Sequence, residues 1–128
     1  CATNFIRALD SAFLRHGRFD YVVPIGLPDT AARLAIWERY VPISMTGLID
    51  LDALVVASDG FSPADVEYAA RRASQEALER ALFAGTDEST PAGPSTKDYI
   101  SAIRSTRTTV SPQVAADFLE DIERLARL

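Results

Sequence analysis

The sequence is poor in the residues that build disulfide frameworks and metal centres. Its 128 residues include one cysteine, Cys1, and one histidine, His16. A single cysteine cannot form an internal disulfide framework, and a single histidine excludes a histidine-rich zinc or iron site within the chain. We therefore expect no metal site from the chain's own side chains. No apolar run reaches the roughly 18 residues of a membrane-spanning helix, so no membrane partner is expected.

Lysine is equally scarce, and its position excludes one way of binding nucleotide. The only lysine, Lys97, lies between Thr96 and Asp98, and the six glycines form no G-x-x-x-x-G-K pattern. That pattern cradles the phosphates of nucleotides in P-loop proteins. On its own, the chain is therefore expected neither to bind a nucleoside triphosphate tightly nor to hydrolyse it.

The composition that remains is that of one soluble globular domain. Hydrophobic residues make up 48% of the chain and charged residues 24%, and the net charge is −5. Residues 1–48 are nearly neutral, with five basic and four acidic residues, whereas residues 49–128 carry eight basic and fourteen acidic residues. This acidic balance argues against a nucleic-acid partner, which requires a basic surface. The sequence starts with no secretory leader, so the cytoplasm is the expected location.

The spacing of apolar residues predicts a mainly α protein. A short helix over residues 6–15, which Gly17 ends, and a strand over residues 19–25 come first. Helices follow from residue 30 onward, and each has a predicted N-terminal capping residue: Asp29, Asp50, Ser62, Thr96 and Ser111. A polar stretch near residues 85–95 predicts a mobile loop.

The longest predicted helix begins after Ser62, with Asp65 three residues further on as in a capping box. Its predicted buried stripe consists of Val66, Ala69, Ala70, Ala73, Ala77, Leu78 and Ala81. Three large aromatic residues are assigned to packing in the core or within the helical part: Trp37, Tyr68 and Phe83.

Two arginines, Arg15 and Arg18, stand three residues apart across Gly17. Guanidinium groups held at a helix end can grip the oxygens of a phosphate, and an arginine supplied by one subunit can stabilise charge on a neighbour's transferring phosphoryl group. Surface arginines near a helix C-terminus are also common. From spacing alone, this second interpretation is favoured.

The order of the motifs in the sequence favours the first interpretation, in which the two arginines act on a phosphate. The sequence contains Ala2-Thr3-Asn4, Leu9-Asp10 and Arg15-x-Gly17-Arg18-Phe19-Asp20, and it continues with Gly26-x-Pro28-Asp29-x-x-x-Arg33-x-x-Ile36 and Asp59-Gly60-Phe61-Ser62-x-Ala64-Asp65. This series resembles the second region of homology and the lid of AAA ATPases, in particular the branch of valosin-containing-protein-like segregases. The resemblance extends over essentially the whole chain and is weakest after residue 85.

The resemblance implies roles for three residues before residue 27. Asn4 matches sensor 1, the asparagine that positions the attacking water and contacts the γ-phosphate. A structural role, capping the turn into the next helix, is compatible with that match. Arg15 and Arg18 match the pair of arginine fingers that act on the nucleotide of the neighbouring protomer. Asp20 is expected to anchor this loop or to contact another subunit; a plain carboxylate at a strand edge is nearly as good an explanation.

The helical part resembles the family's lid, in which the start of the long helix approaches the adenine. Pro63 and Ala64 occupy this place, although the family usually has glycine where this chain has Pro63. Proline has no backbone donor, so only the contact through Ala64 is expected to be retained. Tyr40 falls where many relatives carry a histidine near the adenine; packing in the core is an equally good explanation.

The resemblance also implies a domain division and a function. Residues 1–27 would be the C-terminal remnant of the large α/β subdomain and residues 28–128 the helical lid. ATP and Mg would be held mainly by segments preceding Cys1, which would carry Walker A, Walker B and the pore loop. The parent would be an ATPase that works as a ring, expected to be a homohexamer, and remodels protein substrates, whereas this chain alone would be inactive.

Two missing motifs argue against two branches of the family, the AAA proteases and the proteasomal ATPases. No HExxH follows the lid, and the chain ends Leu125-Ala126-Arg127-Leu128 without the hydrophobic-Tyr-x tail of proteasomal ATPases. A segregase-like or unclassified member is therefore expected. The alternative function is an acidic helical module that binds a protein partner and has no nucleotide role.

Overall fold

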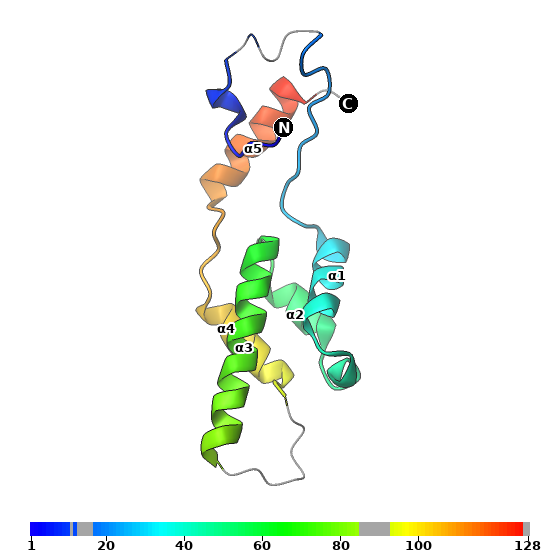
Figure 1. The fold of residues 1–128 in the computed structure, drawn as a ribbon, viewed down its shortest axis with the longest axis vertical. Helices are drawn as coiled ribbons and strands as arrows, with labels where there is room; N and C mark the ends of the chain where they lie inside the picture. Colours follow the sequence, from blue (N-terminus) through cyan, green and yellow to red (C-terminus); the bar gives the residue numbers. More distant parts are fainter. Residues whose placement is uncertain (11, 13–16, 85–92, 127–128) are drawn as a thin grey trace. The chain divides into compact units, whose positions relative to one another are not determined.

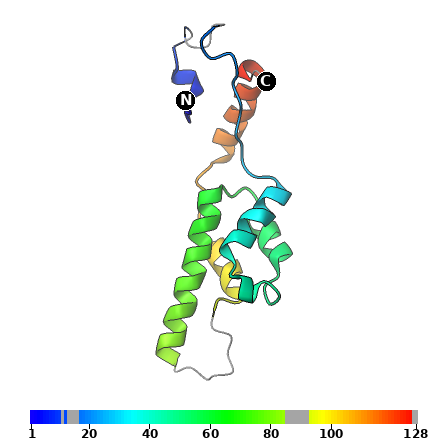
Figure 2. The ribbon, with the colours of Figure 1, turned by 45° about the vertical axis from the view of Figure 1, so that its right-hand side comes forward.

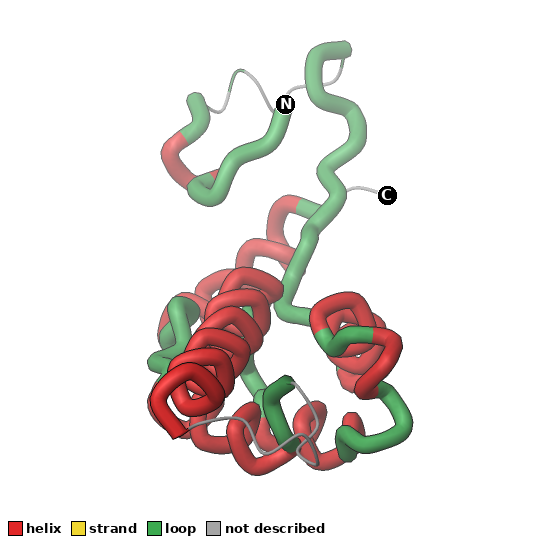
Figure 3. Tube along the Cα trace, turned by 60° about the horizontal axis from the view of Figure 1, so that its bottom comes forward, coloured by secondary structure: helices red, strands yellow, loops and turns green. Residues whose placement is uncertain are grey.

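The computed structural model describes residues 1–128 except 11, 13–16, 85–92 and 127–128. The described residues form two compact units (Figure 1). One consists of Cys1–Gly26 together with Ser111–Leu128, and the other of Leu27–Val110. We call them the terminal unit and the helical unit. The predicted mainly α fold is confirmed: Figure 3 shows helices and loops, and no strand, along the described part of the chain.

The described residues of the helical unit form four α-helices and one short 3-10 helix. They are α1 (Thr30–Tyr40), η2 (Ile43–Met45), α2 (Leu51–Ala57), α3 (Pro63–Ala84) and α4 (Thr96–Ser105). In two views of this unit, α1 and α3 begin at the same end and run in the same direction (Figures 1 and 2). The predicted mobile loop near residues 85–95 lies mostly outside the described residues.

Capping side chains explain where these helices start. Asp29 accepts a hydrogen bond from the backbone of Ala32 at 2.8 Å, and Asp50 accepts one from Ala53 at 3.0 Å. Such caps satisfy the free N–H groups of a first turn. The predicted caps of α1 and α2 are thus confirmed.

The start of α4 differs from the prediction by one residue. Its cap is Ser95, which forms a capping box with Asp98. Thr96 is instead the first helical residue, and its hydroxyl accepts a hydrogen bond from the backbone N–H of Asp50 at 3.0 Å. Both Ser95 and Thr96 are suitable cap residues, so composition alone did not distinguish them.

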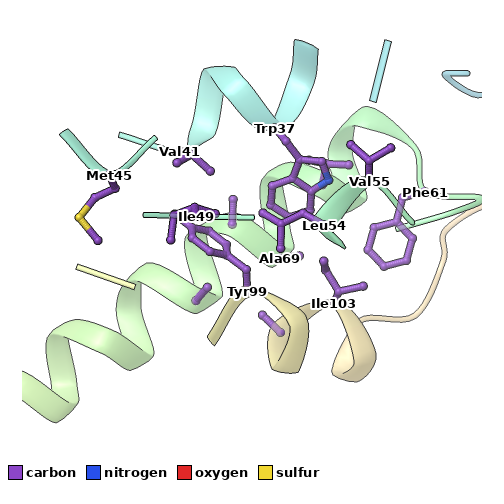
Figure 4. Packing of buried hydrophobic residues seen from close by; sticks show 14 residues of the cluster. Trp37, Val41, Met45, Ile49, Leu54, Val55, Phe61, Ala69, Tyr99 and Ile103 are labelled. Carbon is purple, nitrogen blue, oxygen red and sulfur yellow. The ribbon is translucent and has the colours of Figure 1, made fainter. Parts of the chain in front are cut away.

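All buried hydrophobic residues of the described chain belong to the helical unit (Figure 4). Trp37 and Tyr99 are both fully buried, and their rings meet edge to face with centroids 5.8 Å apart. The indole N–H of Trp37 donates to the Ser58 hydroxyl at 2.9 Å. The prediction that Trp37 packs in the core is confirmed.

Small residues on α3 let the neighbouring helices approach it closely. The buried stripe consists of Val66, Ala69, Ala70, Ala73 and Ala77. The last two residues of the predicted stripe are wrong, because Leu78 and Ala81 are exposed. Tyr68 and Phe83, at 57% and 89% exposed, are not core residues either. Periodicity identified the buried face of α3, but not where the neighbouring helices stop covering it.

The terminal unit contains η1 (Ile6–Ala8) and α5 (Pro112–Leu125). Ser111 caps α5 as predicted, accepting a hydrogen bond from the backbone of Val114 at 3.3 Å. Of the predicted helix over residues 6–15, the described residues form only the three-residue η1; residues 11 and 13–16 lie outside the description. Arg7 on η1 pairs with Glu120 at 2.9 Å and with Asp121, both on α5.

The predicted strand over residues 19–25 is wrong. Within this range Val22 alone forms an isolated β-bridge, and the other residues lie outside any strand. Tyr21, Val23 and Ile25 are 77%, 66% and 87% exposed. A strand is stabilised by pairing with neighbours, and the described residues offer this apolar segment no sheet to join.

The predicted domain division at residue 27 stays a prediction. The compact units change segment between Gly26 and Leu27, but α5 is grouped with the first residues of the chain. No helix of the described chain is long and apolar enough to cross a bilayer.

Candidate functional site

The turn that contains Asn4 is held by its neighbour. The Thr3 hydroxyl accepts a hydrogen bond from the backbone of Phe5 at 3.1 Å. Asn4 itself is exposed and its side chain has no hydrogen-bond partner among the described residues. The interpretation of Asn4 as a turn cap is therefore not what the structure shows. Its amide, which can both donate and accept, is left open to other groups.

The loop around Arg18 is closed by the predicted anchor. Gly17 adopts a left-handed conformation with φ +84°, which favours glycine. Its N–H donates to Asp20 Oδ1 at 2.7 Å, so Asp20 makes the loop contact that was expected of it. Arg18 is exposed, and among the described residues its guanidinium donates to one group, the carbonyl of Ala12, at 3.3 Å. Arg15 lies outside the described residues.

Pro63 and Ala64 occupy the first turn of α3, and both are exposed. The backbone of this turn is fixed by a reciprocal pair of hydrogen bonds. Ser62 N–H donates to Asp65 Oδ2 at 2.9 Å, and Asp65 N–H donates to the Ser62 hydroxyl at 3.2 Å. The predicted capping box is confirmed, and the helix start presents its positive dipole end.

Asp65 is buried and its carboxylate is fully used within the chain. It accepts further hydrogen bonds from the backbone N–H of Thr109 at 3.2 Å and from the Thr109 hydroxyl at 3.1 Å. Burial alone would raise the pKa of Asp65, but the hydrogen bonds from Ser62 and Thr109 outweigh it and lower the pKa. Asp65 therefore stays ionised and acts on the protein's own backbone.

Tyr40 is not brought together with Pro63 and Ala64. It ends α1, is half-buried and packs against the core cluster. The first turns of α1 lie beside the segment that leads into α3, because Arg33 pairs with Asp59. Tyr40 comes about two helical turns after Arg33, roughly 10 Å further along the axis. Core packing thus accounts for Tyr40 in this structure.

Sequence reasoning assigned no role to Arg33, although it is the most connected arginine of the helical unit. Its guanidinium lies 3.0 Å from Asp59 Oδ1 and donates to the carbonyl of Pro28 at 2.9 Å and to that of Val55 at 3.4 Å. One signal could have revealed it: Arg33 lies one turn before Trp37, on the buried face of α1.

No group of three or more histidine, cysteine, aspartate or glutamate residues in the described part of the chain could hold a metal ion. The candidate site therefore has two parts. One comprises Asn4 and the arginine loop in the terminal unit, and the other the first turn of α3 in the helical unit.

No profile of a known protein family matches the chain. Individual relatives do. A probable 26S proteasome regulatory subunit 10B of Caenorhabditis elegans is 42% identical over 78 residues, which are 60% of this chain and 19% of that protein. A cell division cycle protein 48 homolog of Archaeoglobus fulgidus is 39% identical over 63% of this chain and 11% of its own length. The ATP-dependent zinc metalloprotease FtsH 3 of Sphaerobacter thermophilus is 43% identical over 71% of this chain and 18% of its own.

Solved structures agree on the fold. A crystal structure of the FIGL-1 AAA domain matches 99% of this chain and 43% of its own, with 22% identity and a TM-score of 0.80. The same domain with ADP gives a TM-score of 0.77 and covers 44% of that chain. The chain thus spans less than half of a solved AAA domain and at most about a fifth of the length of these curated relatives. The solved structures show the fold, and the similarity in sequence to these relatives shows that the chain belongs to the AAA ATPase family.

Proposed function

We propose that this chain works as one part of an AAA ATPase module whose other segments bind ATP and Mg. It contributes a sensor asparagine, Asn4, a pair of arginine fingers, Arg15 and Arg18, and a nucleotide lid formed by the helical unit. These roles of particular residues go beyond membership of the family. The relatives include proteasomal, Cdc48-type and metalloprotease proteins at comparable identity, so the segregase-like branch remains a prediction.

The observation that carries the proposal is the state of the arginine loop. Asp20 and Gly17 close the loop between them, which leaves the guanidinium of Arg18 exposed and with no acidic partner among the described residues. An arginine held in this way can be given to a phosphate of another subunit. A merely structural arginine would be expected to use its charge on a carboxylate of its own chain, as Arg7 does.

The lid contribution rests on the start of α3. Pro63 and Ala64 are exposed on a helix N-terminus whose conformation the capping box fixes. A nucleotide in the complete module would contact this turn through Ala64 and through the positive end of the helix dipole. Pro63 would contribute shape but no backbone donor.

The complete protein, on this proposal, is a ring of neighbouring protomers, a homohexamer, that couples ATP hydrolysis to the remodelling of a protein substrate in the cytoplasm. The isolated 128-residue chain neither binds ATP tightly nor hydrolyses it. ATP turnover by the purified chain that Arg18→Ala abolishes would contradict this second statement.

The test is the ATPase activity of the complete protein that contains this sequence. Arg18→Ala should lower kcat by about a thousandfold or more, as expected when an arginine finger is removed, with little change in the binding of ATP. The matched control is Arg39→Ala, which removes an exposed arginine from α1 and should leave kcat unchanged. Equal activity of the wild type and Arg18→Ala would show that Arg18 has no catalytic role.

A further inference from the structure

Two of the described charged residues are buried, and both lie in the helical unit. Arg33 is 8% exposed and Asp65 is 2% exposed. Burying a charged group costs free energy unless hydrogen bonds and opposite charge compensate it. The partners of each residue therefore indicate what the buried charge is used for.

Arg33 holds the start of the helical unit. Its guanidinium binds the carbonyl of Pro28, two residues after the chain leaves the terminal unit, and ties it to Asp59 and to the carbonyl of Val55. Val55 lies in the last turn of α2, where carbonyls lack helical partners, so a cation is favoured there.

Asp65 holds the end of the helical unit in the same way. It accepts hydrogen bonds from the backbone and the hydroxyl of Thr109, one residue before the unit's last residue, Val110. Residues 106–110 belong to no helix. The Asp65 carboxylate thus fixes a stretch of backbone that regular secondary structure leaves without partners.

Both contacts converge on one short segment. Asp59, the partner of Arg33, and Ser62, the capping partner of Asp65, are three residues apart in the connection between α2 and α3. The chain enters and leaves the helical unit once each, at residues 26–27 and 110–111. Close to each crossing, a backbone group is held by a buried charged side chain: the Pro28 carbonyl by Arg33, and the Thr109 N–H by Asp65.

We infer that Arg33 and Asp65 are paired positioning residues that fasten both ends of the helical unit to its α2–α3 connection. The fastened ends form one rigid piece with the first turns of α1 and α3. Any change in the relative placement of the two units is then confined to residues 26–27 and 110–111. This inference does not depend on a nucleotide role and would hold for a protein-binding module as well.

The chain supplies a matched control for Asp65. Ser95 and Asp98 form the same capping box at the start of α4, but Asp98 pairs with Arg80 on α3 at 2.7 Å and contacts neither end of the unit. Asp65→Asn and Asp98→Asn therefore both weaken a capping box, and only Asp65→Asn also weakens the hydrogen bonds to Thr109.

The first test is amide hydrogen exchange, measured by NMR on the 128-residue chain. In the wild type the Thr109 amide should be protected. Asp65→Asn should speed its exchange by about tenfold or more, as expected from the loss of a hydrogen bond to a charged group, while amides in the middle of α3 stay protected. Asp98→Asn should leave Thr109 protected. A Thr109 amide that exchanges equally fast in the wild type and in Asp65→Asn would overturn the inference.

The second test measures the spread of distances between the units. Spin labels at Ser101→Cys on α4 and Glu123→Cys on α5, on a Cys1→Ser background, report it by pulsed electron paramagnetic resonance. Asp65→Asn and Arg33→Met should each broaden the distance distribution, and Asp98→Asn should not. Asp59→Asn should broaden it less than Arg33→Met, because Asp59 is 83% exposed and both carbonyl contacts of Arg33 remain. Equal distributions in all variants would overturn the inference, as would broadening by Asp98→Asn alone.

Discussion

The two units of this chain contain similar proportions of hydrophobic residues but bury them to very different extents. In the helical unit, Trp37, Leu54 and Tyr99 are fully buried. In the terminal unit no described hydrophobic residue is buried, and Tyr21 and Ile25 are 77% and 87% exposed. In the helical unit, the local capping signals and the apolar periodicity are supported by a shared hydrophobic core. In the terminal unit, the main polar link among the described residues consists of the ion pairs of Arg7 with Glu120 and Asp121 on α5. Apolar character alone therefore does not predict burial.

The largest expected effect comes from breaking the core of the helical unit. Trp37→Ala should lower the free energy of unfolding by about 3–5 kcal/mol, because it leaves a cavity and removes the partner of Ser58. Its counterpart in the terminal unit, Tyr21→Ala, should change that free energy by no more than about 0.5 kcal/mol. Urea denaturation followed by circular dichroism measures both. Equal losses in the two variants would show that the units do not differ as described.

Lowering the pH is expected to have an intermediate effect on the stability of the protein. The hydrogen bonds from Arg80 hold the pKa of the Asp98 carboxyl well below its usual range. A carboxyl whose pKa is lower in the folded than in the unfolded state stabilises the protein above its unfolded pKa, about 3.9, and this contribution is lost as the pH falls through the folded pKa. Stability of the wild type should therefore decline below about pH 4.

Asp98→Asn tests that assignment. The variant should be less stable than the wild type at neutral pH, and its stability should depend less on pH in the acid range, because one of the carboxyls with a lowered pKa is gone. Asp65, whose pKa is also lowered, remains in this variant and preserves part of the slope. Parallel pH profiles for the two proteins would contradict the role of the Arg80–Asp98 pair.

The smallest effect concerns Tyr99. Its ring is buried, and its hydroxyl has no hydrogen-bond partner among the described residues; burial accordingly raises its pKa. Removing a buried hydroxyl that lacks a partner avoids its desolvation cost. Tyr99→Phe should therefore be neutral or stabilise the helical unit by up to about 1 kcal/mol. A loss of more than about 1 kcal/mol would mean that the hydroxyl has a partner, such as Ser74.

Most of the helical unit could be predicted from the sequence because its signals are local. Asp29, Asp50 and Ser62 each cap the helix that was expected of them. A cap depends on a few neighbouring residues, and so does the periodicity that marks a buried face.

Other features depend on partners far along the chain and were missed or mistaken. The strand over residues 19–25 needs a neighbouring strand, which residue preferences do not supply. The exposure of Leu78 and Phe83 depends on where the helices around α3 end. The clamps formed by Arg33 and Asp65 join residues up to 44 positions apart. The roles of Asn4, Arg15 and Arg18 rest on family resemblance and stay predictions.

Arg18 is proposed to act on the nucleotide of a neighbouring subunit. The most direct measurement is the ATPase activity of the complete protein when wild-type and Arg18→Ala subunits are mixed in increasing proportion at constant total concentration. If Arg18 acts in trans, each variant subunit disables a neighbouring site, and activity should fall more steeply than the wild-type fraction. Activity that falls in direct proportion to the wild-type fraction, or not at all, would contradict the account.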